Sequence, residues 1–428
     1  MFYFNLSLHS LLTNRRQYIS LFLVCMAGVT IILFASFVSQ GMLKSVKQKA
    51  IQYYGGELQF LGGENLGTTC ADETIEELKA FVPERVQFYK RFNYDAANTS
   101  FFFEGESVRQ RVIMGVDFNA EKDLFSHFVF ESGNAQYSGD YDMVLLSSKI
   151  ASKLGVKTGD TVTVQMRTIH GYTNTREVQV QGIFLDSSMF GMYTSYMNLD
   201  ALRSLSDYDS SYVNRICLYY GNGGPDQAEI NKLQKQLETK FNMYPLCNDK
   251  NEFYHALLDD KSVQKPLYGL ITLDANIKEL HMITDAIKLV FVLITVVLIL
   301  IIAVGIGSTY RVIVMKRTTE IGTYRALGMK PEGVRTLFLT EILLLLIFGF
   351  IAGICLALIA VKILSLFNLS FIPAFDLFLS EGHLVPSISV LKMLEYLAII
   401  IVTTMLSVLF TIRNIVHLSP VGALATTN

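Results

Sequence analysis

The sequence is poor in several features that mark common classes of protein. Its 428 residues include no tryptophan, 8 prolines and 5 cysteines, and only 17% of them are charged. The cysteines are scattered, without a Cys-x-x-Cys pair or a Cys/His cluster, so they provide neither a disulfide scaffold nor a zinc motif. The formal net charge of −2 gives no overall field that would attract a polyanion, so we expect no nucleic-acid partner.

Catalytic motifs are missing as well. The nearest approach to a phosphate-binding loop is Gly62-x-x-x-x-Gly67-Thr68-Thr69, which has threonine where the phosphate-binding lysine belongs, and we interpret it as a glycine-rich turn. The 7 histidines form no HExxH motif, and no GxSxG motif occurs. We therefore expect that the chain is not an enzyme, holds no cofactor or metal, and depends on another protein for energy.

Hydrophobic residues are abundant, at 51% of the chain, and they concentrate in charge-free stretches. A helix needs about 20 apolar residues to cross the hydrocarbon core of a bilayer. Four stretches qualify: Tyr18–Val38, Leu289–Tyr310, Ile342–Val361 and Tyr396–Ile412, the last extended back to about Ile388. The first is longer than the apolar part of a cleaved signal peptide, and no A-x-A site follows it, so we interpret it as an uncleaved signal-anchor. The sequence thus predicts four transmembrane helices.

Basic residues in short loops favour the cytoplasmic side of a membrane and so predict the orientation. The segment Arg311–Arg335 contains six basic and two acidic residues, whereas Leu366–Pro386 contains no lysine or arginine. Arg15 and Arg16 before the first helix and Arg413 after the last agree with this pattern. We therefore expect both termini in the cytoplasm and the long segment between the first two helices outside it.

The predicted organisation follows from these two patterns. It comprises a cytoplasmic N-terminal segment (1–16), transmembrane helix 1 (17–43), an extracytoplasmic domain with a helical stalk (44–282), transmembrane helix 2 (283–310), a cytoplasmic loop with a short helix (311–335), transmembrane helix 3 (336–365), an extracytoplasmic loop (366–387), transmembrane helix 4 (388–412) and a cytoplasmic tail (413–428).

The segment inserted between helices 1 and 2 is acidic, with 24 basic and 31 acidic residues, and is long enough for its own core. Its pattern predicts a large mixed α+β domain, with one or two lobes. The first helix should continue to Tyr54 and end at Gly55-Gly56. A strand should follow at 57–61, and Thr74-Ile-Glu-Glu77 matches a capping box that would open a short helix. Further strands are predicted at 161–165, 178–184 and 215–220, and helices at 147–154, 199–205 and 227–240.

The three cysteines of this domain, Cys70, Cys217 and Cys247, lie on the predicted oxidising side. One disulfide among them and three buried thiols are equally compatible with the sequence. An odd number leaves at least one thiol unpaired within the chain.

The most informative cytoplasmic stretch is MKRTTEIGTYRALGMKPEGVRTLFLTE, from Met315 to Glu341. Its first part predicts a helix ended by Gly328, and Pro331 opens a second helix. Ile321, Tyr324 and Leu327 would share one side of the first helix. That side could dock into a groove on a soluble partner, or the helix could lie on lipid headgroups. The residue pattern is equally compatible with both alternatives.

This stretch resembles the signature of the MacB/FtsX-like ABC transporter permeases. The matching residues are Lys316-Arg317, Glu320-Ile321-Gly322, Arg325-Ala326-Leu327-Gly328 and Glu341. SKLGVKTGDTVTVQM at 152–166, GIFLDS at 182–187 and LSPVGALA at 418–425 also resemble segments of that family. The likeness covers essentially the whole chain, and the Arg-Ala-Leu-Gly block is its most specific part.

The resemblance implies a partner for the short helix. In such permeases this helix couples the subunit to a separate dimeric cytosolic ATPase, which binds ATP and Mg²⁺. The residues expected at this ATPase-coupling site are Thr318, Thr319, Glu320, Ile321, Gly322, Tyr324, Arg325, Ala326, Leu327 and Gly328. A second permease subunit, identical or homologous, is also implied, and ATP-driven movement would reach the outer domain, in this family often without passing substrate through the bilayer.

Within the family, Ser39–Gly62 resembles the lipoprotein-releasing LolC/LolE branch, although Gln40-Gly41 and Gly56–Phe60 depart from its pattern. That branch implies extraction of lipoproteins from the outer leaflet of a bacterial inner membrane, with a periplasmic chaperone or adaptor. The alternatives are MacB-like efflux of drugs or peptides and FtsX-like signalling to a cell-wall hydrolase.

Small residues on the predicted spans fit two roles. Gly349 and Gly353 form a GxxxG pattern that permits close helix packing, inside the chain or at a dimer seam. The residues that would suit the wall of an acyl-chain cavity are Ala27, Gly28, Ala35, Ser36, Gly305 and Gly307, and they equally suit plain helix packing.

Overall fold

The computed structural model describes residues 2–186, 190–191, 194–221, 223–369, 372, 375–380 and 382–412. The chain divides into two compact units. The helical unit comprises Met1–Lys44, Thr284–Asn368 and His383–Asn428, and the α/β unit comprises Ser45–Ile283 and Leu369–Gly382. The predicted cytoplasmic tail (413–428) lies outside the described residues.

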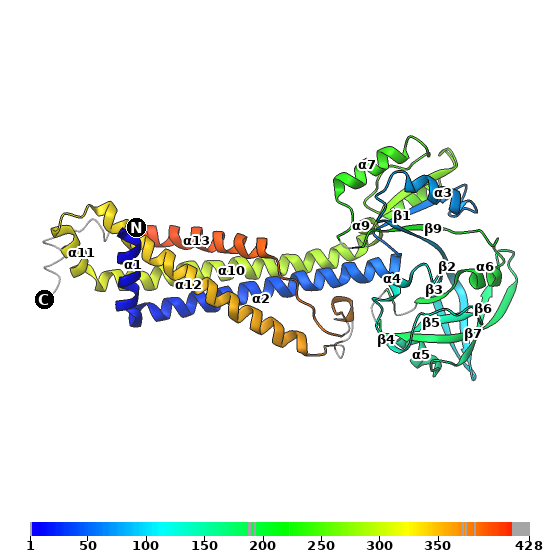
Figure 1. The fold of residues 1–428 in the computed structure, drawn as a ribbon, viewed down its shortest axis with the longest axis horizontal. Helices are drawn as coiled ribbons and strands as arrows, with labels where there is room; N and C mark the ends of the chain where they lie inside the picture. Colours follow the sequence, from blue (N-terminus) through cyan, green and yellow to red (C-terminus); the bar gives the residue numbers. More distant parts are fainter. Residues whose placement is uncertain are drawn as a thin grey trace. The chain divides into compact units, whose positions relative to one another are not determined.

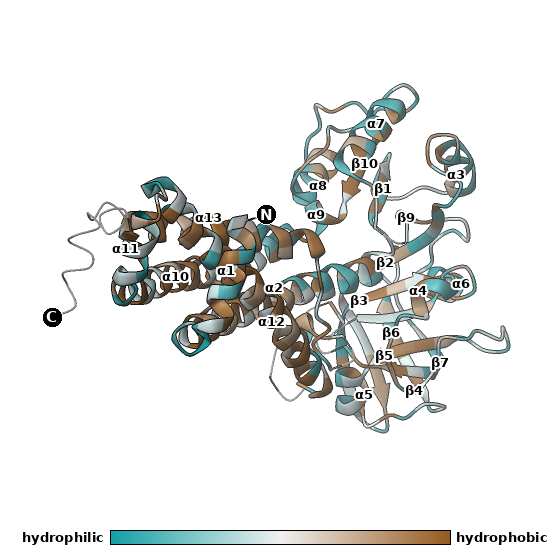
Figure 2. Cartoon of the chain, turned by 60° about the vertical axis from the view of Figure 1, so that its left-hand side comes forward, coloured by the Kyte–Doolittle hydropathy of each residue, from teal (hydrophilic) through white to brown (hydrophobic). Residues whose placement is uncertain are grey.

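The helical unit is built from long apolar helices. Its helices are α1 (Phe2–Thr13), α2 (Arg15–Tyr54), α10 (Lys278–Lys316), α11 (Thr318–Ala326), α12 (Pro331–Leu366) and α13 (Val390–Ile412), of which α2 and α10 continue into the α/β unit. In the described part of the chain, four of them, α2, α10, α12 and α13, are long and apolar enough to cross a membrane. They contain the four predicted stretches, and Figure 2 shows their predominantly hydrophobic surfaces.

The helix α1 was not predicted, because residues 2–13 were interpreted only as an N-terminal segment. The backbone bends after it at Asn14, whose N–H donates to the Ser10 carbonyl oxygen at 3.0 Å. Figure 1 shows α1 crossing the direction of α2 instead of prolonging it.

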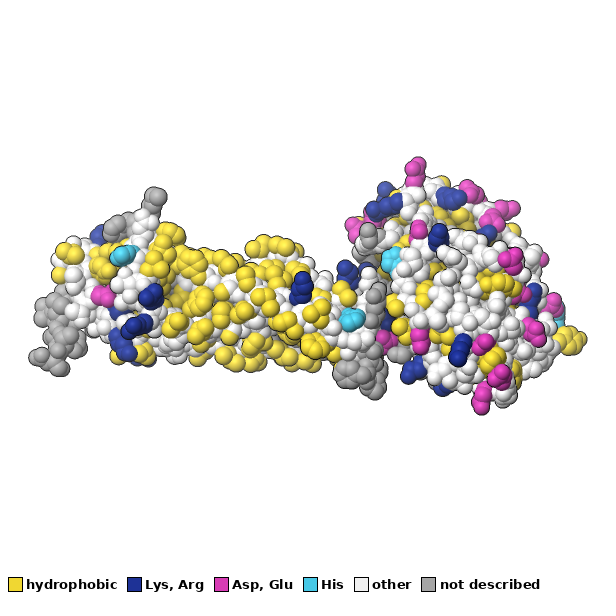
Figure 3. Space-filling view, turned by 60° about the horizontal axis from the view of Figure 1, so that its bottom comes forward, with side chains coloured by type: hydrophobic (Ala, Val, Ile, Leu, Met, Phe, Trp, Pro, Cys, Tyr) yellow, Lys and Arg dark blue, Asp and Glu magenta, His cyan; other side chains and the backbone are white. Residues whose placement is uncertain are grey.

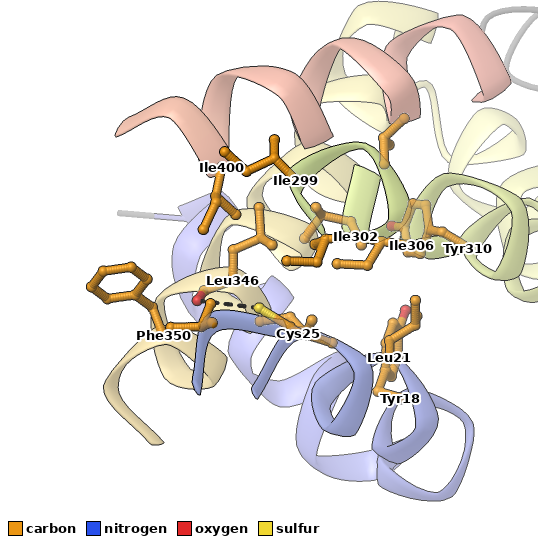
Figure 4. Packing of buried hydrophobic residues seen from close by; sticks show 14 of the residues in the cluster. Tyr18, Leu21, Cys25, Ile299, Ile302, Ile306, Tyr310, Leu346, Phe350 and Ile400 are labelled. Atoms are coloured by element: carbon orange, nitrogen blue, oxygen red, sulfur yellow. Dashed lines mark hydrogen bonds between the residues drawn. The ribbon is translucent and has the colours of Figure 1, made fainter. Parts of the chain in front are cut away.

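The core of the helical unit joins α2, α10, α12 and α13. Its buried residues include Leu21, Cys25, Ile302, Ile306 and Ile400, which point toward one another in Figure 4. The Sγ of Cys25 lies 3.9 Å from the carbonyl oxygen of Leu346, across the α2–α12 contact. On the outside, hydrophobic side chains cover most of the face of this unit seen in Figure 3, as expected for helices surrounded by lipid.

The α/β unit is organised around a mixed sheet. In the described residues its strands are β1 (Leu58–Gly63), β2 (Gln87–Phe103), β3 (Glu106–Val116), β4 (Phe130–Gly133), β5 (Met143–Ser147), β6 (Thr161–Arg167), β7 (Thr173–Phe184), β8 (Thr194–Asn198), β9 (Arg215–Tyr219) and β10 (Leu267–Thr272). Their order is β10-β1-β9-β2-β3-β8-β5-β7-β4, and β6 pairs with β2 and β7.

Helices cover this sheet in two regions. They are α3 (Ala71–Lys79), α4 (Lys122–Phe125), α5 (Ser148–Leu154), α6 (Leu199–Ser206), α7 (Gln227–Leu237), α8 (Lys250–Leu258) and α9 (Leu273–Asn276), with a 3-10 turn at Phe375–Phe378. One hydrophobic cluster joins α3 and α7 to β1 and β9, and another joins α5 and α6 to β5, β6 and β7. The long strand β2 pairs with β9 at one end and with β3 and β6 at the other, so it links the two regions.

Several local predictions are confirmed and others need correction. The helix α2 ends at Tyr54, and Gly55 has φ +79, as the Gly-Gly pair indicated. The capping box at Thr74 is wrong, because α3 already begins at Ala71 and the Thr74 hydroxyl donates to the Cys70 carbonyl oxygen at 2.9 Å. All five cysteines are free, with Cys217 buried and Cys70 exposed, so neither a disulfide nor three buried thiols describes the outer domain.

The glycine-rich segment begins in a strand and not in a phosphate-binding turn. Gly62 and Gly63 end β1 and pair with Tyr268 and Leu267 of β10. At Gly62, with φ +115, an added Cβ would overlap the carbonyl oxygen of Leu267. This glycine is therefore required for the close approach of two strands.

Candidate functional site

The predicted docking helix exists as α11, set off from its neighbours by backbone breaks. Arg317 separates it from α10, and Gly328, with φ +90, follows Leu327, the residue that caps its C-terminal end. Pro331 is the first residue of α12, preceded by Lys330 in an extended conformation. The division at Pro331 and the helix end at Gly328 agree with the sequence prediction.

The proposed docking stripe on α11 needs correction. Ile321 is completely buried and belongs to the hydrophobic core of the helical unit, together with Val334 and Phe338 of α12. Tyr324 is partly buried against the same core, whereas Leu327 is 80% exposed. The three side chains thus do not form one exposed face, because the helical unit itself covers the first of them.

The surface that α11 does expose is small and mostly uncharged. Thr319, Thr323, Ala326, Leu327 and Gly328 are exposed. The remaining predicted residues of the site are half-buried or buried, namely Thr318, Glu320, Gly322 and Arg325. A partner that docks here would meet hydroxyl groups and the Leu327 side chain at the C-terminal end of the helix.

Beneath α11 lies a buried ion pair that the sequence did not predict. The Nη1 of Arg317 donates to Oε2 of Glu341 at 2.9 Å, and the two side chains are 3% and 0% exposed. The guanidinium also donates to Glu320 Oε2 from Nε at 2.8 Å and from Nη2 at 2.6 Å. Further bonds run from Nη1 to the Tyr18 hydroxyl at 2.6 Å and from Nη2 to the Ser10 hydroxyl at 2.9 Å.

Glu341 collects polar groups from two further helices. Its Oε2 accepts from the Tyr18 hydroxyl of α2 at 2.7 Å and from the Tyr310 hydroxyl of α10 at 3.4 Å. Tyr310 also donates to the carbonyl oxygen of Phe338, over whose ring the Arg317 guanidinium lies at 5.1 Å. This group of side chains, which we call the Arg317 cluster (Ser10, Tyr18, Tyr310, Arg317, Glu320 and Glu341), connects α1, α2, α10, α11 and α12.

Arg317 and Glu341, two of the charged residues of the family signature, therefore form one structural unit. Both were already in the quoted motif, but their pairing was not predicted, since they lie on different segments with α11 between them. Nothing in the sequence indicated that three further residues would join this cluster, because they are simply polar residues in apolar helices: Ser10, Tyr18 and Tyr310. In a low-dielectric interior such groups are found where partners satisfy them.

The two glycines of the GxxxG pattern lie against α2 of the same chain. A Cβ at Gly349 would come within 2.8 Å of Cys25 Sγ, and one at Gly353 within 2.6 Å of Val29 Cγ1. This arrangement corresponds to packing inside the chain, the first of the two roles considered.

The six small residues considered for a cavity wall do not share one environment. Gly28, Ser36 and Gly307 are buried, Ala35 and Gly305 are half-buried, and Ala27 is exposed. A Cβ at Gly28 would lie 2.5 Å from Ile302 of α10, and one at Gly307 would overlap Ser407 of α13. These glycines thus permit close packing between helices of the same chain.

A second buried ion pair holds the C-terminal end of α2 in the α/β unit. Arg91 of β2 donates from Nη2 to Glu121 Oε2 at 2.5 Å and from Nη1 to the carbonyl oxygen of Tyr53 at 2.8 Å. A cation at the last carbonyls of a helix interacts favourably with its dipole. Burial alone lowers the pKa of Arg91, but the Glu121 carboxylate raises it, and the net shift is upward.

The short helix α9, which leads into α10, contacts the same end of α2. The Tyr54 hydroxyl donates to the Asn276 carbonyl oxygen at 3.1 Å, and Gln59 of β1 donates from Nε2 to the Tyr54 carbonyl oxygen at 2.6 Å. Asn276 in turn donates from Nδ2 to Gln59 Oε1 at 3.1 Å. Lys250, whose pKa is lowered by burial, donates to the Tyr54 hydroxyl at 3.3 Å.

Two family models match the chain. Residues 22–239 match the MacB-like periplasmic core domain, and residues 292–420 match the C-terminal region of FtsX-like permeases. No curated protein matches the sequence. The FtsX-like match contains α11, most of α10 and all of α12, and the MacB-like match contains most of α2 and β1 to β9.

These matches and the four apolar helices define a membrane-embedded transporter subunit with a periplasmic domain. The chain belongs to the MacB/FtsX-like family of ABC transporter permeases. As a permease subunit of the inner membrane it is not itself a catalytic enzyme. Its family works with a cytosolic ABC ATPase and usually a second permease.

Proposed function

We propose that this chain converts ATP hydrolysis by a separate cytosolic ATPase into movement of its α/β unit, with α11 as the docking element. The observation that carries the proposal is the contrast within α11: Leu327 is 80% exposed, while Ile321 beneath the helix is completely buried. A docking element needs both properties, because a partner requires accessible side chains and a transmitted force requires a fixed base.

The Arg317 cluster supplies that base. Its hydrogen bonds tie α11 to helices that come from four separate parts of the sequence, so a displacement of α11 has to be shared by α1, α2, α10 and α12. Packed interiors transmit strain because they are dense and hardly compressible. On the proposed orientation, with both termini in the cytoplasm, this cluster lies on the ATPase side.

At their other ends, α2 and α10 are bonded into the α/β unit. Both are continuous helices, Arg15–Tyr54 and Lys278–Lys316, and neither is interrupted by proline. Arg91 and Gln59 hold the last carbonyls of α2, and Asn276 precedes α10. Movements of the two helices would thus act directly on β1 and β2, which carry these side chains.

The cargo that we propose is a lipoprotein, extracted from the outer leaflet together with a second permease and handed to a periplasmic chaperone. The support for this step is the resemblance of Ser39–Gly62 to the lipoprotein-releasing branch. That segment includes the end of α2 and most of β1, which are joined by the bond from Gln59 to the Tyr54 carbonyl oxygen. The small residues Ala27 and Ala35, which are not fully buried on α2, remain candidates for contact with acyl chains.

The experiment is an ATPase assay on the complex purified from native membranes and reconstituted in lipid. Addition of an acylated lipoprotein should stimulate ATP hydrolysis, whereas the same protein without its acyl chains should not. Depletion of the chain should also leave lipoproteins in the inner membrane. Equal rates with and without acylation, together with normal lipoprotein sorting, would rule out this cargo. Stimulation by drugs or peptides, or co-purification of a cell-wall hydrolase, would favour efflux or signalling instead.

A further inference from the structure

A groove opens on the helical unit where α1 turns into α2. Its volume is about 570 Å³, within the range of about 300–1,000 Å³ common for ligand sites. Its walls come from α1, from the first turns of α2 and from α12. The apolar lining includes Leu8, Leu12, Ile19, Phe22 and Phe348, and the polar lining includes Arg15 and Arg16.

Buried polar contacts fix the walls of this groove. The Ser7 hydroxyl of α1 donates to the Leu337 carbonyl oxygen of α12 at 3.1 Å, and Ser10 accepts from Arg317 at 2.9 Å. Both serines are buried, so one face of α1 is held against the unit while Leu8 and Leu12 line the groove. Tyr18, which also lines it, is fixed by its bond to Glu341. The groove is therefore already formed before any ligand enters.

The two arginines of the groove differ from the buried Arg91 and Arg317, each of which is paired with a glutamate. Arg15 and Arg16 are exposed, and within the described residues no hydrogen bond or ion pair is found for either. Their neighbours in the lining are leucine, isoleucine, phenylalanine and tyrosine, with no acidic residue. The site thus combines a long apolar wall with two unneutralised guanidinium groups at one place.

We propose that this groove binds an anionic membrane phospholipid, with its phosphate at Arg15 and Arg16 and an acyl chain along Leu12, Ile19 and Phe348. Guanidinium groups bind phosphate oxygens in a bidentate manner, and apolar side chains at an exposed surface favour a hydrocarbon ligand. Leu12 is 66% and Ile19 58% exposed, which suits residues that are covered by lipid. A bound lipid would brace α1, and through Ser10 it would brace Arg317.

The test compares retention of two lipids by the full chain purified in detergent. Phosphatidylglycerol or phosphatidylcholine is titrated in, and bound lipid is counted by native mass spectrometry at low and high salt. We expect preferential binding of phosphatidylglycerol that weakens with salt. Each arginine near an anionic lipid contributes about a fivefold change in affinity, so the double variant Arg15→Gln/Arg16→Gln should bind about 25-fold more weakly. Arg15→Lys/Arg16→Lys should keep most of the preference.

Two further variants separate the groove from its surroundings. Leu12→Asp changes an exposed wall residue, so it should lower phosphatidylglycerol binding without lowering the thermal midpoint. The control Arg311→Gln/Lys316→Gln removes two exposed cations that do not line the groove, and binding should stay unchanged. Equal retention of both lipids, or equal losses in the control, would overturn the proposal. So would efficient cross-linking of two copies through Leu12→Cys, because a second copy would then cover the groove.

Discussion

Arg317 and Glu341 form a buried ion pair, with 2.9 Å between Nη1 and Oε2, at the point where α11 rests on the membrane helices. Arg317 directly precedes α11 and Glu341 lies on α12, and both residues belong to the family signature. Their ion pair therefore joins the two ends of the segment that contains α11. The half-buried Glu320 of α11 accepts from the same guanidinium. The cluster is therefore the structural link between the partner-facing helix and the rest of the helical unit.

Replacing Arg317 should destabilise the helical unit more than replacing Glu341. Arg317→Gln leaves the Glu341 carboxylate buried without a cation, a change that typically costs about 3–5 kcal/mol. Glu341→Gln leaves the guanidinium with Tyr18, Ser10 and Glu320, so its cost should be smaller. Thermal denaturation of the full chain in detergent measures the order. Arg335→Gln, an exposed arginine on α12, should change stability by less than about 0.5 kcal/mol, and a comparable loss there would refute the special role of the pair.

Two hydrophobic residues of α11 should give opposite phenotypes. Leu327→Asp places a charge on an exposed position, so the ATPase should no longer co-purify while the thermal midpoint stays unchanged. Ile321→Asp places a charge in the core and should unfold the helical unit.

Thr336→Asp, on the exposed side of α12, is the matched control for an added charge and should retain the ATPase. If Leu327→Asp retains the ATPase as well, the partner docks elsewhere on the chain.

The sequence was sufficient for the membrane helices because their signal is local. Each needs a charge-free apolar run, and such a run is visible without knowing its neighbours. The end of α2 at Gly55 and the break at Pro331 are local signals of the same kind.

Features that depend on distant partners could not be predicted. Ile321 was placed on a partner-facing stripe because helical spacing shows which residues share a side but not which side is covered. The pairing of Arg317 with Glu341 was likewise missed, since either charge alone is typical of a solvated loop. The strand β2 was not predicted, because its sequence carries no sustained alternation and its partners β9 and β3 are separate segments of the chain.

The contact between α2 and α12 should tolerate no side chain at Gly349. In Gly349→Ala the new Cβ would lie 2.8 Å from Cys25 Sγ and 3.0 Å from Cys25 Cβ, so the helices must separate. Overpacking of this kind costs about 1–3 kcal/mol, measured as a lower thermal midpoint.

A matched control is Gly305→Ala, whose Cβ would have Val24 Cγ1 as its nearest neighbour at 3.9 Å and should be tolerated. Adding Cys25→Ala to Gly349→Ala removes the Sγ and should restore part of the stability. No difference between the two glycine variants would contradict the packing.

Arg91 should be required for the order of the α2 C-terminus. Arg91→Lys keeps one charge beside Glu121 but loses the fork that also reaches Tyr53 and Gln52, and hydrogen bonds to charged groups contribute about 1.5–3 kcal/mol. Hydrogen exchange in peptides covering residues 50–56 should become faster. Lys90→Gln breaks only an exposed ion pair with Asp72, worth less than about 1 kcal/mol, and should leave this exchange unchanged.

Glu57 should make the stability of the α/β unit depend on pH. It is 4% exposed, and its Oε2 accepts the Tyr220 N–H at 2.8 Å. Burial raises the pKa of the Glu57 carboxyl above its ordinary value of 4.5, while the Tyr220 hydrogen bond opposes this shift. A raised pKa means that the folded state holds the proton more tightly than the unfolded chain. The stabilising contribution is therefore complete below the ordinary pKa and is lost as the pH rises through the folded value.

Glu57→Gln keeps an acceptor for Tyr220 and removes the charge, so its thermal midpoint should exceed that of the parent chain at neutral pH and converge with it near pH 4.5. The exposed Glu64→Gln should show no such trend, and a parallel trend there would refute the assignment to Glu57.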